Sequence, residues 1–230
     1  MCLDRYTPIA AVLPTHTKPA PELLSRVTLH STNGLAQALD EFTPRSDAEA
    51  RDVERLRALA VEGDPWDRST PLHATGSAVV VHPDSARILL RWHERMQAWL
   101  QVGGHGDAGE THPFDIALRE AREETGLPDL AWWPDPARPL LVHVAIVPVP
   151  AARGEPQHEH GDLRYVLATT RPADVIPESG SAEVRWFTPN DALAAVPQDS
   201  TRETIERVAQ MLQRSRPAVP SRTHVERRRK

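Results

Sequence analysis

The segment GGHGDAGETHPFDIALREAREETGL, residues 103–127, carries the strongest structural signal in this chain. It places a turn of closely spaced glycines directly before a helical pattern. The helix begins after Thr111 or His112, because Pro113 is a residue favoured in the first turn. It ends at Gly126, since glycine most easily takes the left-handed conformation that closes a helix. The segment therefore predicts a tight bend followed by a helix of about three to four turns.

The predicted helix has one apolar face and one acidic face. The apolar residues share a side that can pack on a sheet, namely Phe114, Ala117, Leu118, Ala121 and Thr125. On the other side, Glu120, Glu123 and Glu124 fall within one arc about 100° wide. Like charges at this spacing repel by about 0.2–0.5 kcal/mol per pair, and only Arg119 lies close enough to offset much of that. A bound cation would reverse the sign of this interaction.

The acidic face has three interpretations. Carboxylate oxygens suit Mg²⁺ or Mn²⁺, and Mg²⁺ leaves coordination positions for substrate phosphates. A solvated surface helix with Arg–Glu pairs would look similar, but the glycine turn upstream argues against it. The same turn, with Gly104, Gly106 and Gly109, also fits the dinucleotide-binding spacing GxGxxG. In that fold the helix should open at the glycines, whereas here it begins only at Pro113. The cluster thus favours a divalent cation and a phosphate-containing substrate.

These residues resemble a known motif, the Nudix box GX5EX7REUXEEXGU, in which U is apolar. Gly104 is followed after five residues by Glu110, and residues 119–127, REAREETGL, match every specified position. One departure is present, because eight residues rather than seven separate Glu110 from Arg119. The added residue can be absorbed in the loop without rotating the glutamate face. Residues 183–187 also look like a late strand that many members carry.

The resemblance implies an α/β fold, a mixed sheet sandwiched between helices (α/β/α), over about residues 72–196. It implies a hydrolase that splits a diphosphate linkage by in-line attack of water on phosphorus. The expected substrate is a nucleoside diphosphate derivative or an oxidised nucleotide, and the cofactor is Mg²⁺ or Mn²⁺. A non-hydrolytic diphosphate-binding protein and an isomerase stay as alternatives. A prenyl diphosphate isomerase would be expected to carry a cysteine in its pocket, and the single cysteine, Cys2, is a poor candidate.

The same resemblance assigns roles residue by residue. Glu120, Glu123 and Glu124 are expected to be metal ligands and catalytic residues, and which of them accepts a proton is left open. The main-chain carbonyl of Gly103 would complete the oxygen shell. Arg119 is the fourth catalytic candidate and would orient the carboxylates, through Glu110.

Candidates also lie outside the helix. Glu159 is predicted as an acidic metal ligand, and Gly104, His105, His158 and His160 as substrate contacts. Zinc would need histidines to converge, which His158 and His160 can do because they alternate on an extended chain. No third strong ligand lies near them at a recognised spacing, so contact with phosphate or substrate is the favoured interpretation.

The rest of the chain predicts strands and covering helices. Strands are expected at residues 74–82, 87–91, 99–102, 140–149, 162–168 and 182–187. Helices are expected at 46–63, with Ser46 as a capping candidate and a role in covering one side of the sheet, and at 203–214. We expect three regions: an N-terminal arm and helical extension (1–71), a Nudix domain with the C-terminal helix (72–214), and a basic, disordered tail (215–230).

Composition limits the partners. A chain of 230 residues can bury a substantial core, and a net charge of −5 gives no general attraction to nucleic acid polymers. One cysteine excludes an internal disulfide framework. No apolar run approaches membrane-spanning length and no signal-peptide pattern is present. We therefore expect a cytoplasmic enzyme with a small-molecule substrate, without a membrane or nucleic-acid partner, and leave a homodimer open.

Overall fold

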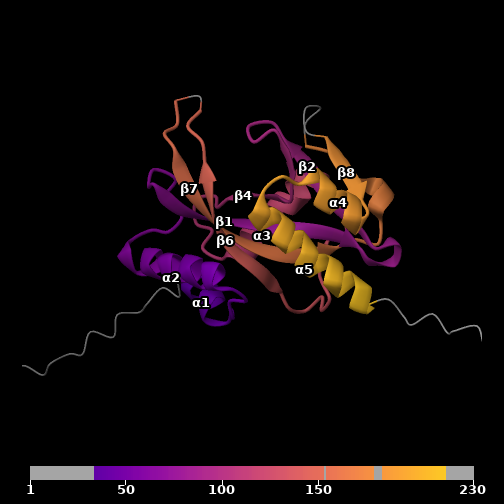
Figure 1. The fold of residues 1–230 in the computed structure, drawn as a ribbon, viewed down its shortest axis with the longest axis horizontal. Helices are drawn as coiled ribbons and strands as arrows, with labels where there is room; N and C mark the ends of the chain where they lie inside the picture. Colours follow the sequence, from indigo (N-terminus) through magenta and orange to yellow (C-terminus); the bar gives the residue numbers. More distant parts are fainter. Residues whose placement is uncertain (1–33, 153, 179–182, 216–230) are drawn as a thin grey trace, which may run out of the picture. The chain divides into compact units, whose positions relative to one another are not determined.

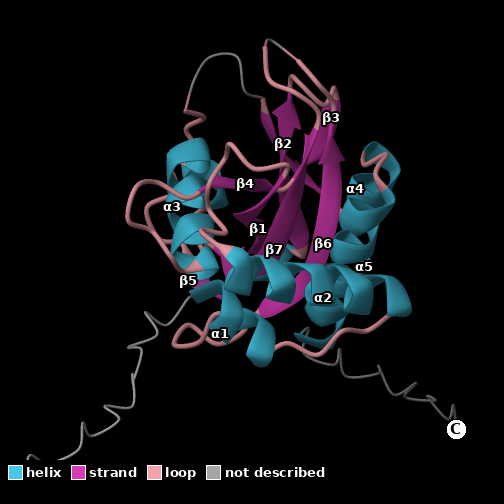
Figure 2. Ribbon diagram, turned by 90° about the vertical axis from the view of Figure 1, so that its left-hand side faces the viewer, coloured by secondary structure: helices cyan, strands magenta, loops and turns pink. Residues whose placement is uncertain are grey.

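A computed structural model describes residues 34–152, 154–178 and 183–215. The predicted arm (1–20) and most of the tail (216–230) lie outside these residues. Within them, one mixed β-sheet lies between two groups of helices (Figure 2). The predicted α/β/α fold is confirmed. None of the helices in the described part of the chain is long and apolar enough to cross a membrane.

The sheet is built around two long central strands, β1 and β7, which run parallel to each other. Its order is β3-β2-β1-β7-β5, with β4 also pairing with β1, β6 with β7, and β8 with β2, all antiparallel. The strands are β1 (Leu72–His82), β2 (Arg87–His93), β3 (Ala98–Leu100), β4 (Val102–His105), β5 (Ala131–Trp132), β6 (Leu141–Val149), β7 (His158–Ala168) and β8 (Val184–Phe187).

Five α-helices cover the described sheet (Figure 1): α1 (Gly34–Asp40), α2 (Asp47–Glu62), α3 (Pro113–Thr125), α4 (Pro189–Ala195) and α5 (Asp199–Ser215). The predicted cap of α2 is confirmed, because the Ser46 side chain accepts a hydrogen bond from the Glu49 N–H at 3.2 Å. Thr188 caps α4 in the same way. Short 3-10 turns follow β1 at Pro83–Ser85 and β7 at Pro172–Asp174.

The core has two halves, one on each face of the sheet. Alternation along β1 sends Ala78 and Val80 into the half covered by α1, α2 and α3. Val79 and Val81 enter the other half, under α4 and α5. Both faces of β1 are therefore buried, which explains its continuous apolar run.

Helix α3 has the predicted bounds. It begins at Pro113 and ends at Gly126, whose φ of 63° is left-handed and whose N–H bonds the Arg122 carbonyl. It lies directly on β1, because a Cβ added to Gly76 would come within 2.4 Å of the Pro113 carbonyl oxygen. This close packing fixes the acidic face of α3 against the sheet.

The expected elements differ from the observed ones in several places. Strand β7 begins at His158, four residues earlier than expected. The strand expected at 99–102 is two strands, because β3 pairs with β2 whereas β4 pairs with β1. The last helix begins at Asp199, four residues earlier than expected. Helix α1 and the short strand β5 were not anticipated.

Candidate active site

Glu124 is the most buried of the three glutamates on α3. Its side chain is 9% exposed, its Oε1 lies 3.0 Å from Nη1 of Arg91 on β2, and its Oε2 accepts the Gly103 N–H at 3.0 Å. Gly103 has a φ of 151°, and an added Cβ would meet the Ser77 Cβ at 2.3 Å. Only glycine fits here, so this part of β4 can bring its main chain to Glu124. Residues 103–105, which were expected in a tight bend, are the end of this strand.

Glu120 faces the next residue of β4, Gly104. A Cβ on Gly104 would lie 2.5 Å from Oε1 of Glu120, so this carboxylate is in direct contact with the backbone of the strand. Burial raises the pKa of Glu120, and the nearby Glu123 and Asp107 add to this, while Arg119 opposes it. The two inward carboxylates thus face two successive glycines.

Arg119 connects the acidic groups. It donates to Glu110 through Nε at 3.0 Å and Nη2 at 2.9 Å, and through Nη1 to Glu120 at 3.1 Å and Glu123 at 2.8 Å. Its Nη2 also donates to the His105 carbonyl at 2.8 Å. Glu123 is the outermost of the three glutamates on α3, with 49% of its side chain exposed.

Glu110 contacts Arg119 although the sequence has one more residue between them than the motif specifies. The loop turns back on itself, since the Glu110 N–H bonds the Asp107 carbonyl and the Asp107 N–H bonds the Glu110 carboxylate at 2.8 Å. Hydrogen bonds from Arg119 hold the pKa of Glu110 below its usual value. The extra residue is absorbed before α3, as the sequence suggested.

The charges of this site do not balance. Glu110, Glu120, Glu123 and Glu124 face two guanidinium groups, those of Arg91 and Arg119. Burial raises the pKa of Glu124 to about 7, outweighing Arg91 and the Gly103 N–H, and the charge of Glu120 raises it further. An all-oxygen donor set with surplus negative charge fits a hard divalent cation.

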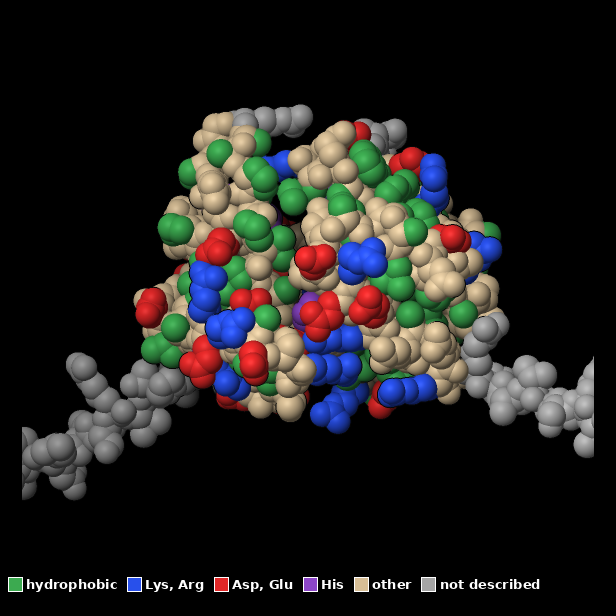
Figure 3. All heavy atoms as spheres, viewed as in Figure 1, with side chains coloured by type: hydrophobic (Ala, Val, Ile, Leu, Met, Phe, Trp, Pro, Cys, Tyr) green, Lys and Arg blue, Asp and Glu red, His purple; other side chains and the backbone are tan. Residues whose placement is uncertain are grey.

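A cavity of about 260 Å³ lies on the opposite face of the sheet from α3. It is lined by Thr75, Ser77, His93, Arg95, Met96, Leu100, Gln101, Gly103, Gly104, His105, Val147, Val149, His160, Asp162, Arg164, Gln198 and Thr201. The glutamates of α3 are not among these residues. Gly103 and Gly104 contact both, so this pair of glycines in β4 joins the cavity to the acidic site. The surface is hollowed here, between the β6–β7 hairpin and the part carrying α4 and α5 (Figure 3).

Two amide oxygens in the cavity wall lack hydrogen-bond donors. The Gln101 Nε2 donates to Asp162 at 3.0 Å, which fixes the amide orientation because a carboxylate only accepts. Its Oε1 is then buried without a partner among the described residues, and so is Oε1 of Gln198. Asp162 is held in turn by Arg164 at 2.7 Å. The wall therefore offers a ligand one acceptor of fixed orientation, Oε1 of Gln101, and a second buried amide oxygen at Gln198.

Four histidines converge beside this cavity. His158 and His160 lie on β7, His73 is the β1 partner of His160, and His105 ends β4. Nε2 of His105 lies 3.1 Å from that of His73 and 3.2 Å from that of His160, which lies 3.1 Å from Nε2 of His158. Burial lowers the pKa of His105 to about 4 and of His160 to about 3. The nearby Arg68 and His73 lower the pKa of His105 further, and His105 and His73 do the same at His160.

The structure brings most of the predicted site residues together. Gly103, Gly104, Arg119, Glu120, Glu123 and Glu124 form one site, and His105, His158 and His160 form a neighbouring group. Glu159 joins neither. It faces away from His158 and His160, because alternate residues of a strand point to opposite faces, and it pairs with Arg55 of α2 at 2.5 Å. Its predicted role as a metal ligand has no support in this geometry.

Sequence reasoning missed Arg91, His73 and Gln101. Arg91 interrupts the apolar face of β2, and this is a signal that could have identified it. His73 and Gln101 carry no local signal, because their neighbours come from distant parts of the chain.

Comparison with known proteins gives a family. The NUDIX domain matches residues 72–208, which is more than half of the chain. The chain therefore belongs to the Nudix family, and its class is that of a Nudix pyrophosphohydrolase. No curated protein matches it.

Solved structures of similar fold include three Nudix enzymes. The dihydroneopterin triphosphate pyrophosphohydrolase of E. coli is 18% identical, covers 60% of this chain and 95% of its own, with a TM-score of 0.46. A NUDIX family hydrolase from Clostridium perfringens is 24% identical, with 61% and 97% covered and a TM-score of 0.47. The Ap4A hydrolase of C. elegans is 16% identical, with 61% and 97% covered and a TM-score of 0.48. These likenesses carry no inference about the substrate of this protein.

Proposed function

We propose that this Nudix protein is a metal-dependent hydrolase that splits a diphosphate linkage in a nucleoside diphosphate derivative or a nucleotide, oxidised nucleotides included. The observation that carries this proposal is the position of Glu120 and Glu124 against Gly103 and Gly104, the two glycines that also line the cavity. A phosphate chain entering beside these glycines would meet these carboxylates.

The residues of the chain divide the work between them. Glu120, Glu123 and Glu124, with the main-chain carbonyl of Gly103, would hold Mg²⁺ or Mn²⁺. When bound, such an ion supplies positive charge to the phosphoryl oxygens and makes water a better nucleophile. Arg119 positions the carboxylates, since it bonds Glu120 and Glu123 together.

The cavity would hold the rest of the substrate. The Oε1 atoms of Gln101 and Gln198 can accept hydrogen bonds from N–H or O–H donors, such as those of a nucleobase or a sugar. A ligand that supplies such donors would relieve the cost of two unpaired buried acceptors. This supports a nucleoside-containing substrate over inorganic diphosphate.

The alternatives are a diphosphate-binding protein without hydrolysis and an isomerase. A binding protein would have no reason to crowd three carboxylates on one helix face. The cysteine-dependent isomerase has little support from the sequence, because Cys2 is the single cysteine and is a poor candidate for a pocket residue. Hydrolysis is therefore the function we favour.

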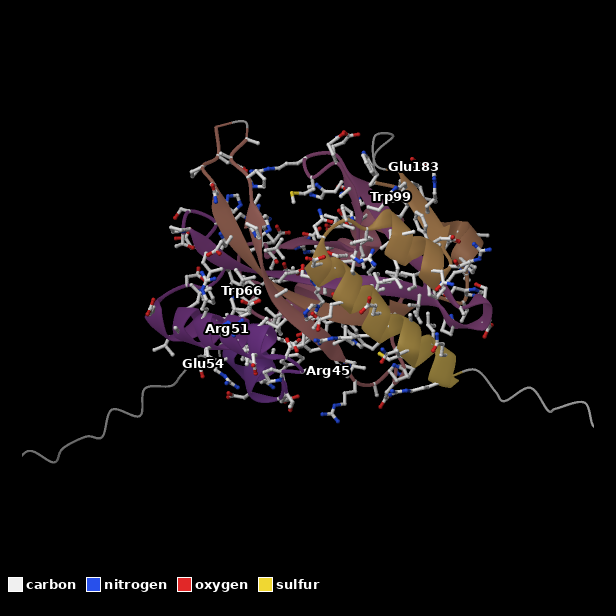
Figure 4. The ribbon with its side chains drawn as sticks, in the orientation of Figure 1. Arg45, Arg51, Glu54, Trp66, Trp99 and Glu183 are labelled. Carbon is white, nitrogen blue, oxygen red and sulfur yellow. The ribbon has the colours of Figure 1, made fainter. Side chains whose placement is uncertain are left out.

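The test is a substrate panel with Mg²⁺ or Mn²⁺, scored for release of phosphate and mononucleotide. It should contain a nucleotide sugar, a dinucleoside polyphosphate and an oxidised nucleoside triphosphate. We expect turnover of at least one compound, and a loss of at least about tenfold for Glu124→Gln, which removes a ligand charge at constant shape. Glu54→Gln is the matched control, because Glu54 lies on the outer side of α2 (Figure 4).

Two outcomes would count against the proposal. Unchanged activity in a folded Glu124→Gln protein would remove the metal assignment. Tight binding of panel compounds without any turnover would favour the binding protein.

Three further points are proposals from the sequence. They are the division into regions at residues 71/72 and 214/215, a cytoplasmic location, and the absence of a nucleic-acid partner.

A further inference from the structure

The strongest unassigned feature is the group of four histidines, His73, His105, His158 and His160. Their side chains share the cavity face of three adjacent strands, β4, β1 and β7. Pairing explains this, because His73 lies opposite His160 and His105 lies opposite Thr75, two residues along the same strand face. His158 precedes His160 by two residues and so shares its face.

The ring nitrogens are arranged as metal ligands are. The ligand atoms of His73, His158 and His160 all lie within 4.8 Å of one another. Nε2 of His105 lies 3.1 Å from His73 and 3.2 Å from His160. In a tetrahedral zinc site with Zn–N bonds of about 2.0–2.1 Å, neighbouring nitrogens are about 3.3–3.4 Å apart. The separations of His105 from His73, of His105 from His160 and of His158 from His160, at 3.1, 3.2 and 3.1 Å, lie within a few tenths of an ångström of this value. His105 lies outside the group of three that share the 4.8 Å limit, so its ring would have to move towards His158 to complete the tetrahedron.

Two of the rings are held in the form that binds a metal. Nδ1 of His73 lies 3.2 Å from the Thr70 carbonyl and Nδ1 of His158 lies 2.9 Å from the Pro156 carbonyl. A carbonyl only accepts, so both Nδ1 atoms carry the hydrogen. Their Nε2 lone pairs then point into the group, which is how outer-shell carbonyls orient metal-binding histidines.

Hydrogen bonding within the group cannot satisfy its members. A neutral ring nitrogen has one hydrogen or one lone pair, yet Nε2 of His105 and Nε2 of His160 each have two ring neighbours. Suppose that His105 donates to His73 and His160 donates to His158. The Nε2 atoms of His105 and His160 then both carry a hydrogen although they lie only 3.2 Å apart. A cation at the centre replaces this conflict with four bonds.

We propose that His73, His105, His158 and His160 bind one Zn²⁺ in a tetrahedral site, separate from the Mg²⁺ or Mn²⁺ site on α3. The ligand chemistry separates the two ions, because imidazole nitrogen suits zinc whereas carboxylate oxygen suits magnesium. Four protein ligands make the site a structural one. It joins β1 and β7 to His105, whose carbonyl accepts from Arg119, so the ion would brace the loop that follows β4.

The first test uses the full chain without a histidine tag. The protein is stripped with a chelator, and Co²⁺ and then Zn²⁺ are added. We expect one ion per chain, the visible bands of tetrahedral Co²⁺, and X-ray absorption showing Zn–N distances of about 2.0–2.1 Å. Absence of stoichiometric binding, or an octahedral oxygen shell, would overturn the proposal whatever the variants do.

The second test locates the ion. His160→Gln should lower zinc affinity by more than the roughly 10–100-fold that loss of an outer-shell partner costs. His82→Gln, at the far end of β1, and Glu124→Gln should bind zinc as the parent does. Circular dichroism of each variant checks folding. Zinc binding that is lost in Glu124→Gln but kept in His160→Gln would place the ion on α3 and contradict this site, while leaving the proposed hydrolysis untouched.

Discussion

Two buried glutamates, Glu49 on α2 and Glu124 on α3, have the same kinds of neighbour but opposite shifts in pKa. Each faces an arginine and at least one backbone N–H. Burial raises the pKa of both carboxyls. At Glu49 the donors outweigh burial and its pKa falls below the usual value, whereas at Glu124 burial wins and its pKa rises to about 7.

The number of donors explains the difference. Glu49 accepts four hydrogen bonds, from the Arg45 N–H at 2.6 Å, the Val144 N–H at 3.2 Å, and both Nη atoms of Arg207 at 2.7 and 2.9 Å. Glu124 has one backbone donor and the single contact with Arg91. A carboxylate that serves the fold is saturated, whereas this one keeps lone pairs free for a ligand.

The largest effect is expected at Glu49, the glutamate that accepts four hydrogen bonds. Glu49→Ala should lower the free energy of unfolding by about 3–5 kcal/mol, because Arg207 would be left buried without its main partner. Urea denaturation followed by circular dichroism measures this. Glu54→Ala, on the exposed face of the same helix, should stay within about 0.5 kcal/mol. A loss below 1 kcal/mol at Glu49 would erase the contrast.

The second-largest effect is expected at Glu124, the glutamate that keeps lone pairs free, and it concerns the binding of Mg²⁺. Mg²⁺ at about 100 times its dissociation constant should stabilise the protein by about 2.7 kcal/mol, since it binds the folded state. The melting temperature should rise accordingly, and Glu124→Gln should abolish most of the rise. Glu49 variants that still fold should keep it. An equal rise in Glu124→Gln would mean that the ion binds elsewhere.

The two glutamates should also respond oppositely to pH. Without metal, the folded state holds the Glu124 proton up to about pH 7, whereas the unfolded chain releases it near 4.5. The stability contributed by this proton is present below pH 4.5 and is lost as pH rises towards 7. Glu49, with a lowered pKa, contributes stability above pH 4.5 that is lost as pH falls.

This prediction is tested by measuring the unfolding free energy of the metal-free protein from about pH 4 to about pH 8, a range that includes the titration of Glu in both states. The difference between the parent and Glu124→Gln should change in the window from about 4.5 to 7 and be level above it. Burial also lowers the pKa of His143. Because His143 is present in both the parent and the variant, its titration cancels from the difference between them. A flat difference would show that folding does not shift the pKa of Glu124.

The smallest expected effect is at Gly104. Gly104→Ala would place a Cβ 2.5 Å from Oε1 of Glu120, the movable end of that side chain. We expect the Mg²⁺ concentration for half-maximal activity to rise by roughly fivefold, or about 1 kcal/mol. Gly63→Ala, whose Cβ meets nothing within 4 Å, is the control. Equal metal requirements in both variants would mean that Glu120 does not hold the ion.

Local signals made α3 predictable from sequence. Pro113, Gly126 and the acidic spacing act within a few turns of one helix, so the bounds and the acidic face follow from neighbouring residues. The fold class followed from the same segment. The orientation of Glu159 could also have been predicted from sequence. Side chains alternate along a strand, so the face that His158 and His160 share excludes Glu159.

Long-range pairing was not predictable. His73 reaches His160 only because β1 and β7 run parallel in one register, and nothing near His73 in the sequence indicates this. The same holds for Gln101 beside Asp162 and for Glu49 beside Arg207, which is 158 residues away. The histidine group and the saturated glutamate therefore became visible only in three dimensions.

The bonds that saturate Glu49 have a consequence for self-association. Among the strands that the structure describes, β6 pairs with β7 alone, so its outer edge would ordinarily be open to strand addition by another chain. Glu49 and Asp52 accept the N–H groups of Val144 and Ile146, and Arg207 donates to the Val142 carbonyl. A second copy could therefore pair with residues 142–146 of β6 only after α2 and α5 had come away.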